Sequence, residues 1–247
     1  MTLPQETVTA LRTLDLGLFD VGPGKRRILC PGFLITTNAG RRILFDTGFP
    51  PAYATDERAA AAAADGLDRF GRLVGFSAAQ TAEGALALLG LRISDISHVI
   101  LSHSHIDHVG SLPLFTHAEI ILTATERAEP APLYFGVNRP MAWPQARYRT
   151  IKRATQICNG LRLIPTPGHT AGHMSALVTV GGSCVMLTAD AINRVSEPAE
   201  GFPDADDPIL AAKSAARVMR IARQTGAEVI YGHEPTQAAT LGRRSWP

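Results

Sequence analysis

The hexapeptide His103-Ser104-His105-Ile106-Asp107-His108 constrains this chain more than any other part of its sequence. It holds four side chains that can bind a metal, and it follows a short apolar segment, residues 99–101, that favours a buried strand. Strand alternation would place His103 and His105 on one side, while Asp107 and His108 can turn toward a second point. Imidazole and carboxylate groups are common ligands of divalent ions. A loop of ordinary surface polar residues is the alternative, but the density of ligands favours a metal site.

Apolar runs rich in β-branched residues predict strands along most of the chain. They cover residues 28–37, 42–45, 99–101, 120–123, 161–164, 176–180, 184–187 and 229–231, and turn sequences at 38–40 and 181–183 predict hairpins. Two helices are expected, from a Ser77 cap to Leu89 before Gly90, and from Asp207-Pro208 to Arg223. Two sheets covered by helices accommodate this order. Residues 49–75 and 127–149 fit neither pattern and are expected to be lids or binding loops.

The order His-x-His-x-Asp-His resembles the signature of the metallo-β-lactamase superfamily. Four further segments resemble the other motifs of that family and occur in its order: Asp46-Thr47-Gly48, Pro167-Gly168-His169, Thr188-Ala189-Asp190 and Tyr231-Gly232-His233. The resemblance spans nearly the whole chain. It implies an α/β fold, an αβ/βα four-layer sandwich of two mixed sheets flanked by helices, with residues 1–247 as a single domain.

The resemblance also implies a dinuclear site for two divalent metal ions, with Zn²⁺ as the expected metal. One ion would bind His103, His105 and His169, the other would bind Asp107, His108 and His233, and Asp190 would bridge them. Paired metals can activate a water as nucleophile and polarise a carbonyl group. Asp107 would be the catalytic residue, because a carboxylate there can carry a proton to the leaving oxygen.

Two residues are expected to support the metal ligands. Asp46 would hold an imidazole by its second nitrogen, and a simple turn cap before Gly48 is the alternative. His173 follows His169 by four residues, but the intervening Thr-Ala-Gly favours a turn, so we assign it a structural role.

Among members of the superfamily, the full His and Asp set is most like that of the N-acyl-homoserine lactonases, and is also similar to that of type II glyoxalases. We expect a hydrolase that opens a lactone ring. A thioesterase or amidase that acts on another ester, thioester or lactam is the alternative. Only 14 residues follow His233, which leaves no room for the C-terminal helical portion of a glyoxalase.

The residues around the substrate are less constrained. The resembling lactonases usually carry a Tyr three residues after the bridging Asp, where this chain has Asn193. Asn193 could donate a weaker hydrogen bond or only line the site. Tyr134, Phe135 and Trp143 could form an apolar wall, or pack their loop onto the core. The same aromatic segment could instead serve a homodimer.

Composition and charge narrow the partners and the compartment. A net charge of +2 gives no electrostatic case for nucleic acid, and no apolar run is long enough to span a membrane. Cys30, Cys158 and Cys184 are far apart in sequence and flanked by apolar residues, so we expect buried core thiols rather than a disulfide framework. With no secretory signal visible at the N-terminus, we expect a cytoplasmic protein that acts on a small molecule.

Overall fold

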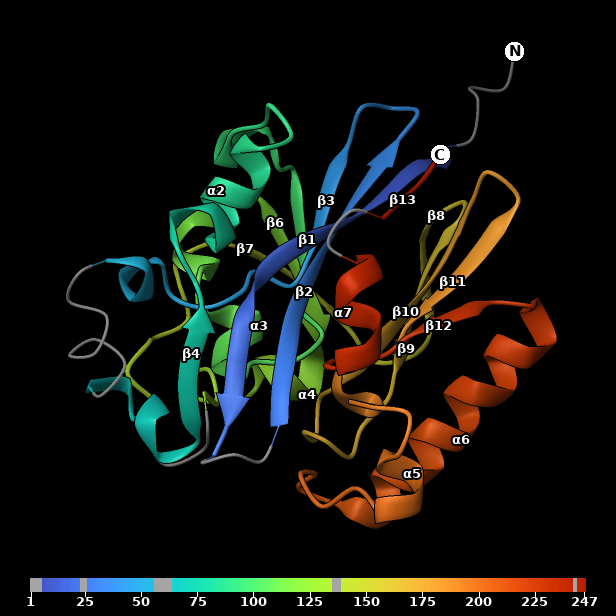
Figure 1. Cartoon of the computed structure of the whole chain (residues 1–247). Coiled ribbons are helices and arrows are strands. Elements are labelled where there is room, and N and C mark those ends of the chain that lie inside the picture. The colour runs from blue at the N-terminus through green and yellow to red at the C-terminus, as the bar shows by residue number, and fades with distance from the viewer. Residues whose placement is uncertain (1–5, 23–25, 56–63, 135–138, 242–243) are drawn as a thin grey trace.

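A long antiparallel hairpin, β1 (Val8–Val21) and β2 (Arg26–Thr37), is the framework of the first sheet. The computed structural model describes residues 6–22, 26–55, 64–134, 139–241 and 244–247 (Figure 1). The other strands of this sheet are β3 (Arg42–Phe45), β4 (Gly71–Gly75), β5 (His98–Ile100), β6 (Glu119–Thr123), β7 (Arg147–Ile151) and β13 (Ser245–Trp246). They lie in the order β13-β1-β2-β3-β5-β6-β7, and β4 pairs with β1.

The second sheet has five strands. These are β8 (Thr155–Cys158), β9 (Leu161–Pro165), β10 (Met174–Val180), β11 (Ser183–Leu187) and β12 (Glu228–Ile230), in the order β12-β11-β10-β9-β8. Since β10 is antiparallel to β9 and β11, and β12 is parallel to β11, strands β9, β11 and β12 run in one direction. In the first sheet, β3 and β5 are parallel as well. The carboxyl ends of parallel strands meet at one edge of a sheet, and the motif residues follow these strands.

Helices cover the outer faces of both sheets. The α-helices are α2 (Ala82–Ala87), α3 (Ile106–Val109), α4 (Ala124–Arg127), α5 (Glu197–Glu200), α6 (Pro208–Thr225) and α7 (Pro235–Leu241). Short 3₁₀ helices lie at η1 (Pro51–Ala54), η2 (Leu67–Arg69), η3 (Ala78–Gln80), η4 (Ile93–Asp95), η5 (Leu112–Phe115) and η6 (Ala189–Ala191). Among the described residues, no helix combines the length and the apolar character that crossing a membrane requires.

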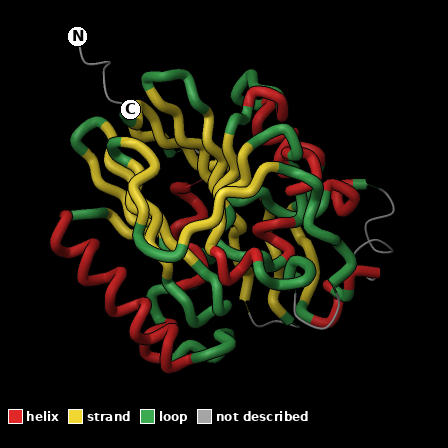
Figure 2. Tube along the Cα trace, turned by 180° about the vertical axis from the view of Figure 1, so that it is seen from behind, coloured by secondary structure: helices red, strands yellow, loops and turns green. Residues whose placement is uncertain are grey.

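The apolar side chains form layers between these elements. One large cluster packs α2 and its neighbours onto the first sheet, and includes Leu44, Leu86 and Val99. A second cluster fills the space between the sheets, where Ile35 and Ile100 meet Leu163 and Val178. A third packs α6 onto the second sheet. The order of layers is therefore helix, sheet, sheet, helix, as Figure 2 shows from behind, and the predicted four-layer α/β sandwich is confirmed.

Three differences from the sequence prediction have local causes. The expected helix from Ser77 is split, because Thr81 is extended and starts α2 with its own side-chain cap. Strand β1 was not predicted, although Leu14, Leu16 and Leu18 alternate with other residues, since a register shift between Asp15 and Leu18 interrupts the pattern. The segment 49–75 also contains β4, which pairs with β1. The helix from Asp207 is confirmed as α6.

Candidate metal centre

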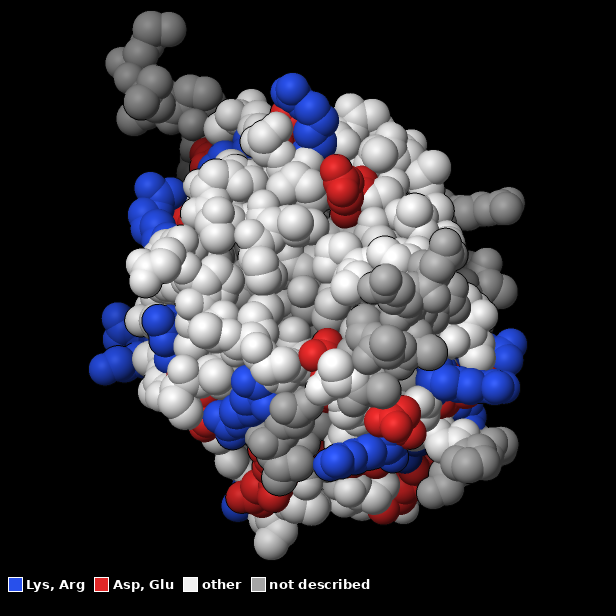
Figure 3. All heavy atoms as spheres, turned by 90° about the vertical axis from the view of Figure 1, so that its left-hand side faces the viewer, with Lys and Arg blue, Asp and Glu red and all other residues white. Residues whose placement is uncertain are grey.

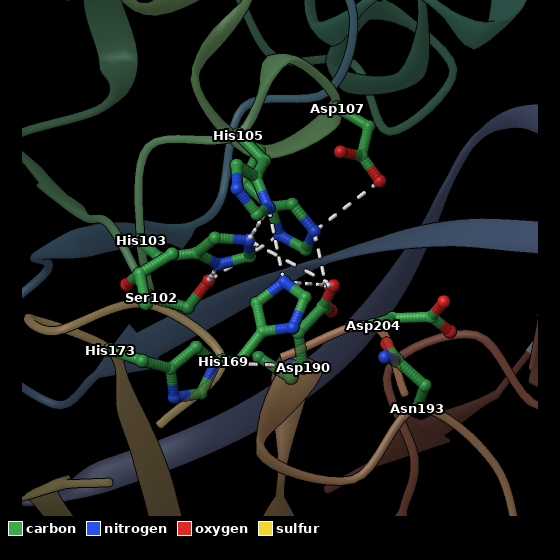
Figure 4. Close-up of polar contacts among 12 residues, drawn as sticks. Ser102, His103, His105, Asp107, His169, His173, Asp190, Asn193 and Asp204 are labelled. Carbon is green, nitrogen blue, oxygen red and sulfur yellow. Dashed lines mark hydrogen bonds and ion pairs between the residues drawn. The ribbon is translucent and has the colours of Figure 1, made fainter. Parts of the chain in front are cut away.

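One group of ligand atoms comes from both sheets. His103 and His105 follow β5, His169 follows β9, and Asp190 lies in η6 after β11. His105 Nδ1 lies 3.0 Å from both His103 Nε2 and His169 Nε2. Asp190 Oδ2 lies 3.1 Å from His169 Nε2 and 3.8 Å from His103 Nε2. Figure 4 shows these side chains converging on one point.

A second group lies beside the first. His108 Nε2 and His233 Nε2 each lie 3.3 Å from Asp107 Oδ2. Asp190 Oδ1, the other oxygen of the shared carboxylate, lies 3.4 Å from His108 Nε2 and 3.3 Å from His233 Nε2. Asp190 therefore presents one oxygen to each group. The structure brings all seven predicted ligands together.

The geometry and chemistry of both groups fit divalent ions. Ligands about 2.0–2.1 Å from a tetrahedral zinc lie roughly 3.3 Å apart, close to the separations measured here. His108 Nε2 and Asp190 Oδ1 are buried and, within the described part of the chain, lack a hydrogen-bond partner. Buried polar atoms without partners are rare in native proteins unless an ion or water binds them. The residues present therefore suit metal binding at both points.

Asp46 orients the second group from behind. One of its oxygens accepts hydrogen bonds from the Ser102 hydroxyl at 2.8 Å and from His108 Nδ1 at 2.9 Å, and the other accepts from the Ser102 backbone amide at 2.7 Å. This contact leaves His108 Nε2 to face the site. His233 is held in the same way, because its Nδ1 donates to the Leu29 carbonyl at 2.8 Å.

Both ring nitrogens of His173 make hydrogen-bond contacts away from the two ligand groups. Its Nε2 accepts a hydrogen bond from the Asp190 backbone amide at 3.1 Å, and its Nδ1 contacts Thr166 Oγ1 at 2.8 Å. It therefore supports the turn that carries Asp190. The placement agrees with the role predicted for His173, which stays a proposal.

Burial and charge divide the histidines into two electrostatic classes. Burial and the neighbouring imidazoles lower the pKa of His105 to about 3 and hold the pKa of His103 well below its usual value. Burial also acts to lower the pKa of His108 and His233, but the carboxylates of Asp107 and Asp190 outweigh it and raise both pKa values well above normal. His103 and His105 are thus neutral and able to ligate, while His108 and His233 carry positive charge that a bound cation would replace.

A cavity of about 480 Å³ opens onto the ligands. Its lining comes from β1 and β2 of the first sheet, from adjoining loops and from the ligand segments. The lining residues include Phe19, Ile28, Phe49, Phe70, Leu133, Arg26, Asn193, Asp204, His105 and Asp107. Among the described residues, Tyr134 and Trp143 do not line it. Apolar lining comes from β1, β2 and residues 49–75, and Leu133 is contributed by residues 127–149.

The two aromatic residues pack elsewhere. Tyr134 is buried in the core cluster of the first sheet. Trp143 donates its Nε1 hydrogen to the Glu129 carbonyl and stacks against Arg127. This placement fits the alternative of a loop packed onto the core, and a substrate-lining role for Tyr134 and Trp143 stays a prediction. Phe135 lies outside the described residues.

Two functional neighbours were missed by the sequence reasoning. Glu126 accepts hydrogen bonds from the Ser104 amide at 2.8 Å and from Thr170 Oγ1 at 2.9 Å, so it ties together the loops of His105 and His169. Cys30, expected only as a core thiol, is buried with its Sγ 3.7 Å from Asp107 Oδ2, and burial raises its pKa to about 11. No local sequence pattern marks either contact. Cys184, also expected to be buried, is partly exposed because it lies near the β10–β11 turn.

The surface around the cavity carries mixed charge. Figure 3 shows acidic and basic side chains next to one another below a largely uncharged area. Arg26 pairs with Asp204 at 3.1 Å, and Arg194 Nη1 lies 3.4 Å from the same carboxylate. Arginines are thus matched by acids at this end of the cavity.

A family model for the metallo-beta-lactamase superfamily matches residues 29–233, which include every predicted metal ligand. The chain belongs to the metallo-beta-lactamase superfamily. An N-acyl homoserine lactonase of Bacillus thuringiensis is 30% identical over 154 residues, which cover 62% of this chain and 61% of that relative. A probable metallo-hydrolase of Mycobacterium tuberculosis is 29% identical over 188 residues, covering 66% of this chain and 57% of the relative.

Solved structures show similarity over almost the whole chain. An N-acyl homoserine lactone hydrolase with N-hexanoyl-L-homoserine at its catalytic metal centre has a TM-score of 0.80 and 25% identity, covering 95% of this chain and 96% of that one. A mutant of B. thuringiensis AiiA, with N-decanoyl-L-homoserine bound at its active site, has a TM-score of 0.81, 25% identity and the same coverage.

Proposed function

We propose that this protein is a dinuclear metal-dependent hydrolase that opens the ring of an N-acyl homoserine lactone or a related small lactone. The observation that carries the proposal is the Asp190 carboxylate, which gives one oxygen to each of two ligand groups beside the cavity. The relatives named as lactonases, and the similar structure with a ring-opened product at its metal centre, support the substrate class.

In this proposal, His103, His105 and His169 hold one zinc ion, and Asp107, His108 and His233 hold the other, with Asp190 shared. Two such ions, when bound, supply a water of lowered pKa and polarisation of the substrate carbonyl. The chain fixes these ligands through Asp46 and His173, so that the reacting groups are already oriented when the substrate arrives.

Asp107 is the residue that we propose moves the proton. Its carboxylate lines the cavity and faces His108 and His233. It takes a proton from the attacking water and delivers it to the ring oxygen as the carbon–oxygen bond breaks, which gives a hydroxy acid. The apolar side chains of Phe19, Ile28 and Phe70 offer a surface for the acyl chain and displace water from it.

Metal analysis and hydrolysis of N-hexanoyl-homoserine lactone test the proposal together. We expect about two metal ions per chain, and a loss of kcat of roughly 100-fold or more in Asp107→Asn, which removes the proton carrier. His169→Ala should lose metal and activity. The control is His117→Ala, whose ring hydrogen-bonds to the Ile93 and Ile96 carbonyls and lies beside the Phe115 ring, outside both ligand groups.

Two results would contradict the proposal. Full activity in Asp107→Asn would remove Asp107 from its role. Faster turnover of a thioester or a lactam than of any lactone would instead support the thioesterase or amidase alternative on the same metal centre.

A further inference from the structure

Asn193 is held by a buried carboxylate at the wall of the cavity. It lies three residues after Asp190 and is only 3% exposed. Its Nδ2 donates to Glu197 Oε1 at 3.1 Å, and its backbone amide donates to Glu197 Oε2. Glu197 begins α5 and is 2% exposed. Both hydrogen bonds go to one side chain, so the amide plane of Asn193 is fixed.

Glu197 also decides which end of that amide faces the site. An ionised carboxylate accepts hydrogen bonds but donates none, so the nitrogen of Asn193 must face it and the oxygen must face away. Burial raises the pKa of Glu197, while the two hydrogen bonds from Asn193 and the Arg194 Nη1 atom 3.8 Å from Glu197 Oε1 favour the ionised form. The opposite orientation would place Asn193 Oδ1 next to Glu197 Oε1, and both of these atoms can only accept hydrogen bonds.

The amide oxygen that results is an unpaired acceptor. Within the described residues, Asn193 Oδ1 is buried and has no hydrogen-bond partner. Asn193 lines the same cavity as His105, Asp107, His169 and Asp190. In Figure 4 its amide end is turned toward the metal-ligand cluster, on the side of Asp190. A buried acceptor without a partner is costly, which favours any ligand that brings a donor to it.

The polarity of this group is opposite to the weak donor that the sequence suggested. A carbonyl oxygen cannot pair with Asn193 Oδ1, because both atoms only accept. An N–H can. In an N-acyl amino lactone, an amide N–H is attached to the carbon next to the carbonyl that reacts, and this places a donor close to the metal ligands.

We propose that Asn193 Oδ1 accepts a hydrogen bond from an N–H on the carbon next to the reacting carbonyl, and so selects α-acylamino lactones over lactones that lack this donor. The inference rests on the proposed lactone hydrolysis and adds a specificity-determining residue to it. Glu197 is its positioning residue, because it acts only through Asn193.

The test compares two lactones that differ in one group. N-hexanoyl-homoserine lactone carries the N–H, and α-hexanoyloxy-γ-butyrolactone has an oxygen in its place. Ring opening of each by the metal-loaded enzyme is followed by product mass, and the ratio of the two kcat/KM values is the readout. We expect wild type to favour the amide by about tenfold or more, since the ester leaves the buried acceptor unpaired.

Two variants and one control complete the experiment. Asn193→Leu removes the acceptor, so the ratio of kcat/KM for the amide lactone to that for the ester lactone should fall by about tenfold or more. Glu197→Gln should reduce the ratio less, because a neutral amide no longer dictates the orientation of Asn193. Ser196→Ala, on the same loop and bonded to Glu200, should keep the wild-type ratio. Comparing ratios between variants cancels the different intrinsic reactivity of the two lactones.

The outcomes separate this inference from the proposed function. If wild type opens both lactones, and Asn193→Leu and Glu197→Gln keep the wild-type ratio of the two kcat/KM values, the inference fails and the hydrolase proposal stands. If both rates fall by the same factor in the variants, Asn193 is only structural and the inference again fails. If metal-loaded wild type opens neither lactone, the proposed function itself fails.

Discussion

Asp46 combines an unusual backbone conformation with hydrogen bonds to Ser102 and His108. Its φ of +63° places it in the left-handed region, where its two oxygens meet the Ser102 amide and hydroxyl and His108 Nδ1. Asn tolerates this backbone conformation, so Asp46→Asn tests the charge and the acceptor alone. An amide must present its NH₂ group either to the Ser102 amide or to His108, and neither placement keeps all the hydrogen bonds.

We therefore expect Asp46→Asn to weaken binding of the second metal ion by about 10- to 100-fold, and the first ion much less. Stepwise zinc titration by calorimetry measures both affinities. Asp95→Asn is the matched control, because the Asp95 carboxylate hydrogen-bonds to Arg92 and belongs to neither ligand group. Equal weakening of both sites would show that Asp46 supports the whole loop rather than His108.

The sequence was sufficient to predict which side chains converge at the candidate metal centre, because these residues lie in short motifs at strand ends. His103 to His108 carry their chemistry within six residues, and Asp46 and His173 stand inside recognisable segments. The residues that act through distant contacts could not be found in this way. Glu126 meets Ser104 and Thr170 across 22 and 44 positions, and the role of Glu197 depends on which end of an amide it faces.

At the scale of elements, the strand ends were predicted better than the loops between them. Runs of β-branched residues marked the core strands, since both faces of these strands are buried. Strand β1 was missed because its bulge breaks the alternation, and its Phe19 supplies part of the cavity wall that the sequence assigned to residues 127–149. Loop conformation depends on contacts far along the chain, which local propensity does not contain.

The turn after β12 offers a sharp test at this scale. A Cβ atom on Gly232 would lie 2.7 Å from Asp190 Oδ1 and 2.6 Å from the Ala189 carbonyl oxygen. Its backbone is not in the left-handed region, so Gly232→Ala costs space rather than backbone strain. We expect this variant to displace the shared carboxylate and to lower kcat/KM by roughly tenfold or more, with reduced metal content.

Gly90→Ala is the contrasting variant. Gly90 has a φ of +71° and open space around it, so alanine there strains the backbone far from the metal centre. It should lower the free energy of unfolding by about 1 kcal/mol and leave metal content and kcat/KM unchanged. Thermal melts, metal analysis and lactone hydrolysis on both variants distinguish the two effects. Normal metal content in Gly232→Ala would contradict the placement of Asp190.

At the scale of the whole molecule, the ligands join two sheets that are also linked by apolar packing and by hydrogen bonds, such as that from the Met174 amide to the Ser102 carbonyl and those of Glu126. His103, His105, Asp107 and His108 follow a strand of the first sheet, while His169, Asp190 and His233 follow strands of the second. A cation held by both sets would link the sheets at one edge. The single-domain organisation, the homodimer and the cytoplasmic location that the sequence favours stay predictions.

Removal of the metal should therefore lower the stability of the fold as well as its activity. A ligand that binds only the native state stabilises it by RT ln(1 + [L]/Kd), or about 4 kcal/mol at a thousand times Kd. We expect a chelator to lower the Tm of wild type by several degrees, and zinc to restore it. In His169→Ala the chelator should have a much smaller effect, because one group of ligands is already incomplete. Hydrogen exchange should locate the loss at the strand ends that carry the ligands, while Ile35, Ile100 and Val178 between the sheets stay protected. A Tm that is identical with and without chelator, in protein shown to lose its metal, would mean that the apolar layers and the hydrogen bonds between the sheets hold them together without the metal.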